Sequence, residues 1–260
     1  MSTPPRPSGL PVAIVTGGSR GIGRAVVERL CRDGHAVVFT HSSSGAEAAR
    51  VEHDLRAGGH QVWAERLDVT GDDAPGRLFD LAESRGRVTA LVNNAGVTGP
   101  LGPLTGLPDA DLRRIVDVNL TAPARLCREA ARRWTDGGGT DGGGTVRRAI
   151  VNVSSVAART GSPHEYVVYA ATKAAVETLT LGLAKELGTA GILVNAVSPG
   201  TTDTTIHARA GEPGRARRVA ASIPLRRPAA PAEIAAAVSW LLSPDASYVT
   251  GTVLNVAGGL

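Results

Sequence analysis

A phenol and an ammonium lie four residues apart in the segment Tyr169-Ala-Ala-Thr-Lys173. On a helix this spacing places both groups on one face. A neighbouring cation favours the phenolate and lowers the pKa of a tyrosine toward the working range of an acid/base catalyst. The chain has three tyrosines, and only Tyr169 is followed four residues later by a lysine. The pair therefore predicts acid/base chemistry, with Tyr169 as the proton donor.

Two serines precede this pair, at the end of an apolar stretch. Ser155 stands fourteen residues before Tyr169, and Ser154 directly precedes it. A serine at the carboxyl end of a strand can donate a hydrogen bond to a substrate carbonyl beside the tyrosine. Either serine taken alone could merely cap the strand. Both are candidates, and we favour Ser155.

A glycine-rich segment follows the first apolar stretch and reads Thr16-Gly17-Gly18-Ser19-Arg20-Gly21-Ile22-Gly23. Glycines at such a strand-to-helix turn let the backbone approach a pyrophosphate, and the helix N-terminus offers N–H donors to it. The spacing is G-x-x-x-G-x-G, not the common G-x-G-x-x-G. The segment predicts a dinucleotide-binding site.

The residues after the second apolar stretch indicate which dinucleotide is bound. An acidic residue at this point would bind the 2′-hydroxyl of NAD and repel a 2′-phosphate. The chain instead has His41-Ser42-Ser43, and Arg20 lies in the glycine segment. An arginine and two hydroxyls suit a phosphate, through charge-assisted hydrogen bonds. NADP(H) is therefore the predicted cofactor, although Arg20 could also be a solvated loop charge.

Short apolar stretches alternate with amphipathic ones along the chain, which is typical of βαβ units around a parallel sheet. Strands are predicted at Val12–Thr16, Ala36–Thr40, Gln61–Leu67, Ala90–Asn94, Ala149–Ser154, Ile192–Val197 and Val253–Val256. Helices are predicted at Gly23–Asp33, Gly45–Ala57, Asp72–Ser84, Asp109–Trp134, Tyr166–Leu187 and Pro231–Leu242. The pattern predicts one α/β domain over residues 12–260, a doubly wound Rossmann-type domain with a seven-stranded parallel sheet and helices on both faces.

The remaining segments are predicted from their composition. Residues 1–11 contain four prolines and no apolar stretch, and are expected to be a disordered leader and not a signal peptide. Residues 135–145 read TDGGGTDGGGT and are expected to form a surface loop. Residues 201–225, rich in glycine and arginine, are expected to cover the substrate. Their arginines, Arg209, Arg215, Arg217 and Arg218, would suit an acidic or carrier-bound substrate, or are solvated charges.

Composition excludes several classes of protein. The formal charge is +4 over 260 residues, but the arginines are scattered among acidic residues, so no nucleic-acid partner is predicted. No membrane-spanning segment is predicted, because no apolar run reaches the roughly 18–20 residues that a span needs, and no metal site is predicted. Two cysteines, Cys31 and Cys127, are expected to be buried and reduced. The expected location is the cytoplasm.

These motifs together resemble the compact branch of the short-chain dehydrogenases/reductases, over essentially the whole chain. Within that family the chain is most similar in character to 3-oxoacyl-acyl-carrier-protein reductases and sugar dehydrogenases. The resemblance implies a catalytic tetrad of Asn119, Ser155, Tyr169 and Lys173. The distance from Ser155 to Tyr169 is one residue longer than in many bacterial ketoacyl reductases, which is why Ser154 also stays a candidate.

The resemblance also extends the set of cofactor residues. It implies an adenine contact at Asp68-Val69, a motif beside the cofactor at Asn94-Ala95-Gly96, and a nicotinamide contact after Pro199-Gly200. The complete predicted set is Gly17, Ser19, Arg20, Gly21, Ile22, Gly23, His41, Ser42, Ser43, Asp68, Val69, Asn94, Ala95, Gly96, Tyr169, Lys173, Pro199, Gly200, Thr202 and Thr204.

The activity implied by the resemblance is NADPH-dependent reduction of a ketone or 3-oxoacyl group to a secondary alcohol. Tyr169 would protonate the oxygen, Ser155 would hydrogen-bond it, and Lys173 would lower the Tyr169 pKa and bind the nicotinamide ribose. Asn119 would position a water that relays protons to Lys173. Two alternatives stay open: a silent NADP-binding sensor or scaffold on the same fold, and a dehydrogenase that oxidises a sugar-like or steroid-like alcohol. The family resemblance also implies a homotetramer or a dimer.

Overall fold

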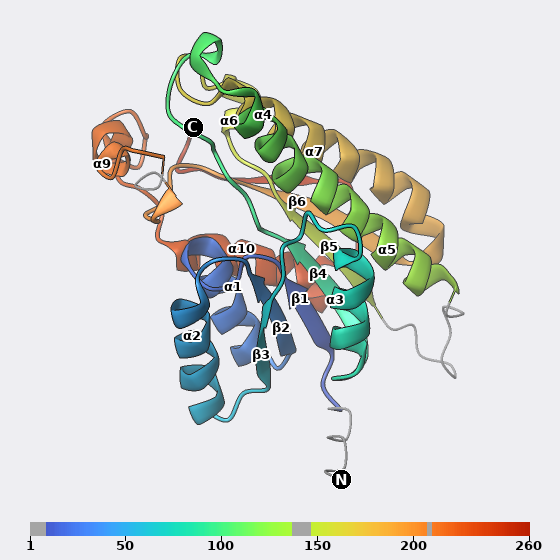
Figure 1. Ribbon diagram of the computed structural model, residues 1–260. Coiled ribbons are helices and arrows are strands. Elements are labelled where there is room, and N and C mark those ends of the chain that lie inside the picture. Colours follow the sequence, from blue (N-terminus) through green and yellow to red (C-terminus); the bar gives the residue numbers. More distant parts are fainter. Residues whose placement is uncertain (1–8, 137–146, 207–209) are drawn as a thin grey trace.

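The computed structural model describes residues 9–136, 147–206 and 210–260, and its core is a seven-stranded parallel sheet (Figure 1). The strand order is β3-β2-β1-β4-β5-β6-β7. The strands are β1 (Val12–Val15), β2 (Ala36–His41), β3 (Val62–Arg66), β4 (Val88–Asn93), β5 (Arg148–Val153), β6 (Ile192–Pro199) and β7 (Val253–Val256). This confirms the predicted doubly wound α/β fold, with strand ends that differ from the predicted ones by a few residues.

Helices cover both faces of this sheet (Figure 1). One face is covered by α1 (Gly21–Arg32), α2 (Gly45–Ala57) and α10 (Pro231–Leu242). The other is covered by α3 (Ala74–Glu83), α4 (Asp109–Val116), α5 (Ala122–Asp136) and α7 (Val167–Leu187). Two short helices, α6 (Ala157–Thr160) and α9 (Arg215–Ala220), lie beyond the carboxyl ends of the strands.

Strand β1 illustrates why the sequence forms this sheet. All four of its residues are buried, because helices cover both faces. Successive side chains point to opposite faces of a strand. Ala13 and Val15 therefore join the core beneath α1 and α10, whereas Val12 and Ile14 join the core beneath α3, α5 and α7. A continuous apolar run is thus what this central strand requires.

The helix predicted over Asp109–Trp134 is not one regular α-helix. It consists of α4, a π-helical segment at Asp117–Thr121, and α5. A π-helical turn inserts an extra residue and is common at functional sites. Asn119 lies within this segment. Amphipathic periodicity predicted the helix correctly but gave no sign of the irregular turn.

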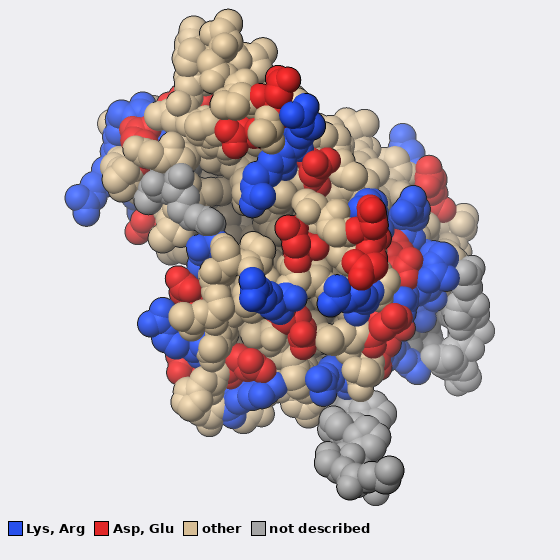
Figure 2. Space-filling view, viewed as in Figure 1, with Lys and Arg blue, Asp and Glu red and all other residues tan. Residues whose placement is uncertain are grey.

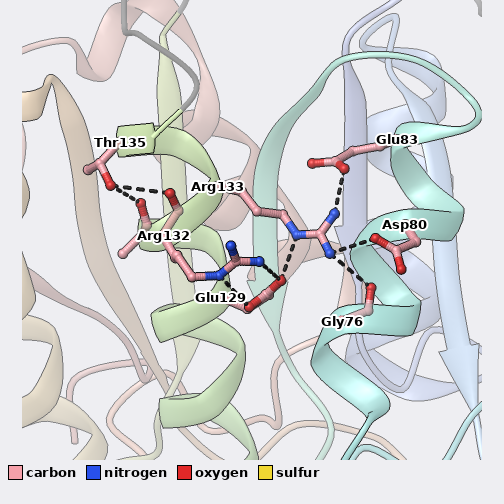
Figure 3. Close-up of polar contacts among 8 residues, drawn as sticks. Gly76, Asp80, Glu83, Glu129, Arg132, Arg133 and Thr135 are labelled. Atoms are coloured by element: carbon pink, nitrogen blue, oxygen red, sulfur yellow. Dashed lines mark hydrogen bonds and ion pairs between the residues drawn. The ribbon is translucent and has the colours of Figure 1, made fainter.

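A network of charges joins α5 to α3 on the surface of the molecule (Figure 3). The Arg133 guanidinium donates to Asp80 at 2.6 Å, to Glu83 at 2.5 Å and to Glu129 at 2.6 Å. It also lies 5.5 Å over the ring of Phe79. One half-buried arginine therefore links two helices on the same face of the sheet. Such a network stabilises the fold more than an isolated exposed ion pair, which contributes little to the free energy of unfolding.

Helix α7 corrects one expectation about the sequence. With the turn that follows it, Val167–Ala190 is long and apolar enough to cross a membrane by length and composition. Here this helix packs against the sheet, and it carries Tyr169 and Lys173. Thr180 accepts a 2.9 Å hydrogen bond from Asn152 on β5, which itself accepts one from Asn93 on β4. About a third of the most apolar part of this segment is buried, on the side of α7 that packs against the sheet.

The segments predicted from composition are described only in part. Residues 1–8 of the predicted leader lie outside the described residues, but Pro11 accepts a hydrogen bond from Ala36 and so adjoins the sheet. Of the glycine-rich stretch 135–145, the first two residues belong to α5 and the others lie outside the described residues. Within the segment 201–225, residues 207–209 also lie outside the described residues. The expectation that the segment 201–225 covers the substrate stays a prediction.

The two cysteines are free and buried, as expected. Burial raises the pKa of both thiols to about 12, so they behave as apolar side chains. On the face drawn in Figure 2, lysine and arginine side chains alternate with acidic ones and form no continuous basic surface.

Candidate active site

A cleft of about 310 Å³ lies at the carboxyl ends of the strands. The strand order reverses between β1 and β4, so the connections from these two neighbours run to opposite sides of the sheet. Such a switch point leaves a crevice in which α/β proteins bind their ligands. All the predicted cofactor residues line this cleft, together with Ser155. The cleft thus brings together residues from the ends of six strands, β1 to β6.

The glycine turn after β1 leaves space for a ligand because its glycines have no side chains. A Cβ at Gly23 would lie 2.2 Å from the carbonyl oxygen of Gly17, so the turn and α1 pack too closely for any other residue. The Asn94 amide donates to the carbonyls of Thr16 and Gly17, at 2.9 and 3.1 Å. The turn is therefore fixed from two sides, in a form that fits the pyrophosphate of a dinucleotide.

Two contacts that the sequence did not predict support this turn. The hydroxyls of Ser19 and Ser44 are 2.6 Å apart, which ties the glycine turn to the segment after β2. The Gly17 amide donates to the Thr40 hydroxyl at 3.3 Å. Helix α1 begins at Gly21, so its first N–H groups face the cleft. A helix N-terminus at this position attracts a phosphate.

The far end of the cleft is lined by Arg20, His41, Ser42 and Ser43. Burial and the nearby charge of Arg66 lower the pKa of His41, so that this imidazole is neutral at pH 7. Asp68, also in the lining, accepts hydrogen bonds from the backbone and hydroxyl of Thr70. One cationic side chain, Arg20, and two serine hydroxyls therefore lie together at this end of the cleft.

The structure distinguishes the two candidate serines. Ser154 is buried, and its hydroxyl donates to the Glu177 carboxylate at 2.8 Å and approaches the Lys173 carbonyl at 3.2 Å, both on α7. Ser155 lies in the cleft lining and its hydroxyl contacts the Tyr169 phenol. Although Ser154 also borders the cleft, its hydroxyl is committed to α7. Ser155 is therefore the one placed to contact a substrate.

Tyr169 is half-buried in the cleft, with the Lys173 ammonium 5.6 Å from the centre of its ring. Burial raises the pKa of Tyr169, whereas the hydrogen bond with Ser155 and the charge of Arg215 lower it. Lys173 is itself buried, which lowers its pKa to about 8, and its ammonium donates to the Val153 carbonyl at 2.6 Å. The predicted lowering of the Tyr169 pKa by Lys173 stays a prediction.

Asn119 does not line the cleft. It is fully buried, and its amide both accepts from the Val97 N–H at 2.9 Å and donates to the Val97 carbonyl at 2.8 Å. These two bonds fix the segment after β4, in which Gly96 lies beside both Asn119 and Lys173. The structure therefore places Asn119 directly behind the wall of the cleft. Its predicted water relay to Lys173 stays a prediction.

Beside Tyr169 lies a group of side chains whose mutual contacts the sequence did not predict. Tyr166 and Arg215 both line the cleft. Arg215 donates to Glu165 at 3.1 Å through Nε, and Arg218 donates to the same carboxylate at 2.9 Å. Arg218 also pairs with Glu212 at 2.6 Å. Both arginines thus have carboxylate partners, but Arg215 is largely buried, whereas the Arg218 side chain is 53% exposed and remains a solvated charge.

Within the described part of the chain, no cluster of three or more His, Cys, Asp or Glu side chains could hold a metal ion.

Comparison with known proteins decides the family. A family model described as enoyl-(acyl carrier protein) reductase matches residues 17–260. The uncharacterized oxidoreductase YgfF of Escherichia coli is 41% identical over 249 residues, which are 95% of this chain and 99% of that protein. A cis-4-hydroxycyclohexanecarboxylate dehydrogenase of Sinomonas cyclohexanicum is 40% identical over 95% of both chains. This chain belongs to the short-chain dehydrogenase/reductase family.

Solved structures of this family agree closely with the fold. A blue fluorescent protein from a metagenomic library, in complex with NADPH, is 34% identical with a TM-score of 0.83, over 96% of this chain and 97% of that one. A 3-ketoacyl-(acyl-carrier-protein) reductase of Brucella melitensis, in complex with NADH, is 29% identical with a TM-score of 0.84 over the same shares. Our short-chain dehydrogenase/reductase is thus an oxidoreductase that acts on hydroxyl or carbonyl groups with a nicotinamide cofactor.

Proposed function

We propose that this short-chain dehydrogenase/reductase uses NADPH to reduce a ketone, or a 3-oxoacyl group, to a secondary alcohol. The observation that carries the proposal is the position of Ser155 and Tyr169 together in the cleft, with Lys173 beneath the tyrosine ring. Both hydroxyls can contact one substrate oxygen there. The nicotinamide cofactor, when bound, supplies the hydride.

The state of Tyr169 favours the reducing direction. Burial raises its pKa, so the phenol is protonated at neutral pH and can give its proton to the substrate oxygen as negative charge develops. The Ser155 hydroxyl donates a hydrogen bond to the same oxygen and stabilises that charge. With a pKa of about 8, Lys173 can return a proton near neutral pH. An arginine there would stay protonated.

The preference for NADPH rests on the lining of the cleft beyond the glycine turn. Arg20 and the hydroxyls of Ser42 and Ser43 line the position where a 2′-phosphate would bind, and the chain has no acidic residue at positions 41–44. Charge-assisted hydrogen bonds to a phosphate are about twice as strong as neutral ones. One relative was solved with NADPH and another with NADH, so the family alone does not choose.

The opposite direction is a second candidate, because the relative from Sinomonas is named as a dehydrogenase of a hydroxycyclohexane compound. The same residues would then act in reverse, with Tyr169 accepting the proton of the alcohol. A silent cofactor-binding sensor is disfavoured by the intact Ser155, Tyr169 and Lys173. We further propose a cytoplasmic homotetramer or dimer with a small-molecule substrate.

The test is oxidation of NADPH, followed at 340 nm, with a panel of ketones, 3-oxoacyl thioesters and sugars. The proposal expects at least one carbonyl compound to be reduced by the wild type and not by Tyr169→Phe. Tyr248→Phe is the matched control, because Tyr248 is fully exposed and remote from the cleft. Tight NADPH binding without turnover of any panel member would favour the sensor, and turnover only of alcohols with NADP⁺ would favour the dehydrogenase.

A further inference from the structure

Arg114 is a cation of the cleft lining that the proposed chemistry does not use. It lies in the last turn of α4, it is exposed, and it borders the same cleft as the glycine turn and Tyr169. The other three cations of this lining are already engaged. Lys173 donates to the backbone of β5, Arg215 pairs with a carboxylate, and Arg20 borders the position proposed for a 2′-phosphate.

The Arg114 side chain has no partner on its own helix. Ion pairs at helical spacing are common in this chain, for example Arg24–Glu28 on α1, Arg56–Glu52 on α2 and Arg77–Asp73 on α3. Arg114 has an acidic residue three positions away on each side, Asp111 and Asp117. Within the described part of the chain, however, its side chain forms no ion pair or hydrogen bond. Solvent or a bound anion is therefore left as the partner of this guanidinium.

Helix α4 lies directly behind the segment that follows β4. The Asn119 amide, at the end of this helical stretch, holds both backbone groups of Val97. Val118 borders the cleft as well, one turn after Arg114. Residues four apart lie on one face of a helix, so this face is the one turned toward the cleft. The guanidinium thus belongs to the wall of the cleft on the β4 side.

The glycine turn forms the opposite wall at the same point of the cleft. Strands β1 and β4 are neighbours, and Asn94 donates to the carbonyls of Thr16 and Gly17. The turn leads into α1 on one face of the sheet, and α4 lies on the other face (Figure 1). A helix N-terminus supplies only about half an elementary charge, less than a pyrophosphate carries. A cation on the opposite wall would neutralise the remainder.

We propose that Arg114 binds the pyrophosphate of the nicotinamide cofactor from the wall of the cleft opposite the glycine turn. A guanidinium forms charge-assisted hydrogen bonds with phosphate oxygens, often two at once. The position proposed for a 2′-phosphate follows β2, which lies on the far side of β1 from β4. The contact of Arg114 therefore contributes equally to NADPH and NADH, in contrast to that of Arg20. This inference concerns cofactor binding alone and is independent of the substrate and direction proposed above.

The experiment measures the affinities for NADPH and NADH by fluorescence titration of the wild type, Arg114→Gln and Arg113→Gln. Arg113 is the matched control, because it is an exposed arginine of the same helix turn that does not border the cleft. Arg114→Gln is expected to lower both affinities about tenfold, the effect of one charged hydrogen bond, and Arg113→Gln less than about twofold. The pyrophosphate is the only anionic group of NADH, so the loss with NADH should shrink in about 1 M NaCl.

Four results would overturn the inference. A loss of NADH affinity below about threefold would mean that Arg114 is a solvated charge. A loss confined to NADPH would assign Arg114 to the 2′-phosphate. An equal loss in Arg113→Gln would show only long-range attraction, and a loss that salt does not change would show a structural effect. Glutamine has a helix propensity close to that of arginine, so the exposed substitution is expected to leave the thermal unfolding temperature unchanged.

Discussion

The Lys173 ammonium donates a 2.6 Å hydrogen bond to the carbonyl of Val153, the last residue of β5. One lysine thus joins α7, which carries Tyr169, to the strand whose end carries Ser155. Lys173 is one of only two lysines in a chain rich in arginine. Its burial explains why arginine would not serve, since arginine cannot lose its charge in a protein.

The buried ammonium should make stability depend on pH. The folded pKa of Lys173 is about 8, below the ordinary value of 10.5, so the unfolded chain binds the proton more tightly. Its burial therefore penalises folding at low pH, and the free energy of unfolding should rise as the pH increases through 8 toward 10.5. Between pH 7.5 and 9.5 we expect the Lys173→Met variant to lack about 2 kcal/mol of the rise seen in the wild type. Urea unfolding at both pH values measures this, and equal rises would contradict it.

The two adjacent serines should separate catalysis from packing. Ser155→Ala should lower kcat/KM by about 10²-fold or more, because it removes a donor to the substrate oxygen. Ser154→Ala should keep most of the activity and lower the free energy of unfolding by about 1–3 kcal/mol, because Glu177 loses a buried partner. Steady-state kinetics and urea unfolding of both variants decide the matter. The reverse pattern would mean that Ser154 contacts the substrate.

Two glycines in helices provide a matched test of the cofactor turn. Alanine at Gly23 would meet the Gly17 carbonyl at 2.2 Å, whereas alanine at Gly182, on α7, would meet no atom within 4 Å. Gly23→Ala should therefore abolish tight NADPH binding. Gly182→Ala should leave binding intact and stabilise the helix by up to about 1 kcal/mol. Fluorescence titration with NADPH and thermal unfolding provide the comparison. Normal NADPH affinity in Gly23→Ala would contradict the conclusion that the glycine turn binds the cofactor and has no room for a side chain at position 23.

Arg20 should determine the choice of cofactor. If its guanidinium contacts the 2′-phosphate, Arg20→Ala should lower kcat/KM with NADPH about tenfold or more relative to NADH. Added salt should also lower the preference of the wild type for NADPH over NADH, because it screens the charge of Arg20. Parallel assays with both cofactors measure the ratio. An unchanged ratio would mean that Arg20 is only a surface charge.

Sequence periodicity predicted the fold well because the strands are covered on both faces. Strands such as Val12–Val15 are apolar throughout, and the turns between them carry glycine at the points of close approach. The cleft residues could be predicted too, since in a parallel sheet the carboxyl ends of the strands meet at one edge. Here local patterns and the global arrangement agree.

What could not be predicted depends on side-chain direction. Adjacent serines look equivalent in a sequence, and only the packing of Ser154 against Glu177 separates them. The Tyr169–Lys173 spacing correctly predicts that both residues lie on one helix face. It does not predict the hydrogen bond from the Lys173 ammonium to the Val153 carbonyl. Arg215 and Glu165 are fifty residues apart, and no local pattern predicts their contact.

The central claim is that Tyr169 transfers the proton to a carbonyl oxygen in this cleft. The most direct measurement pairs the NADPH affinity of Tyr169→Phe with its turnover of the best carbonyl substrate of the panel. We predict an NADPH affinity close to that of the wild type and a fall in kcat of about 10²-fold or more, in line with loss of an acid catalyst. Turnover of Tyr169→Phe within about threefold of the wild type would contradict the account.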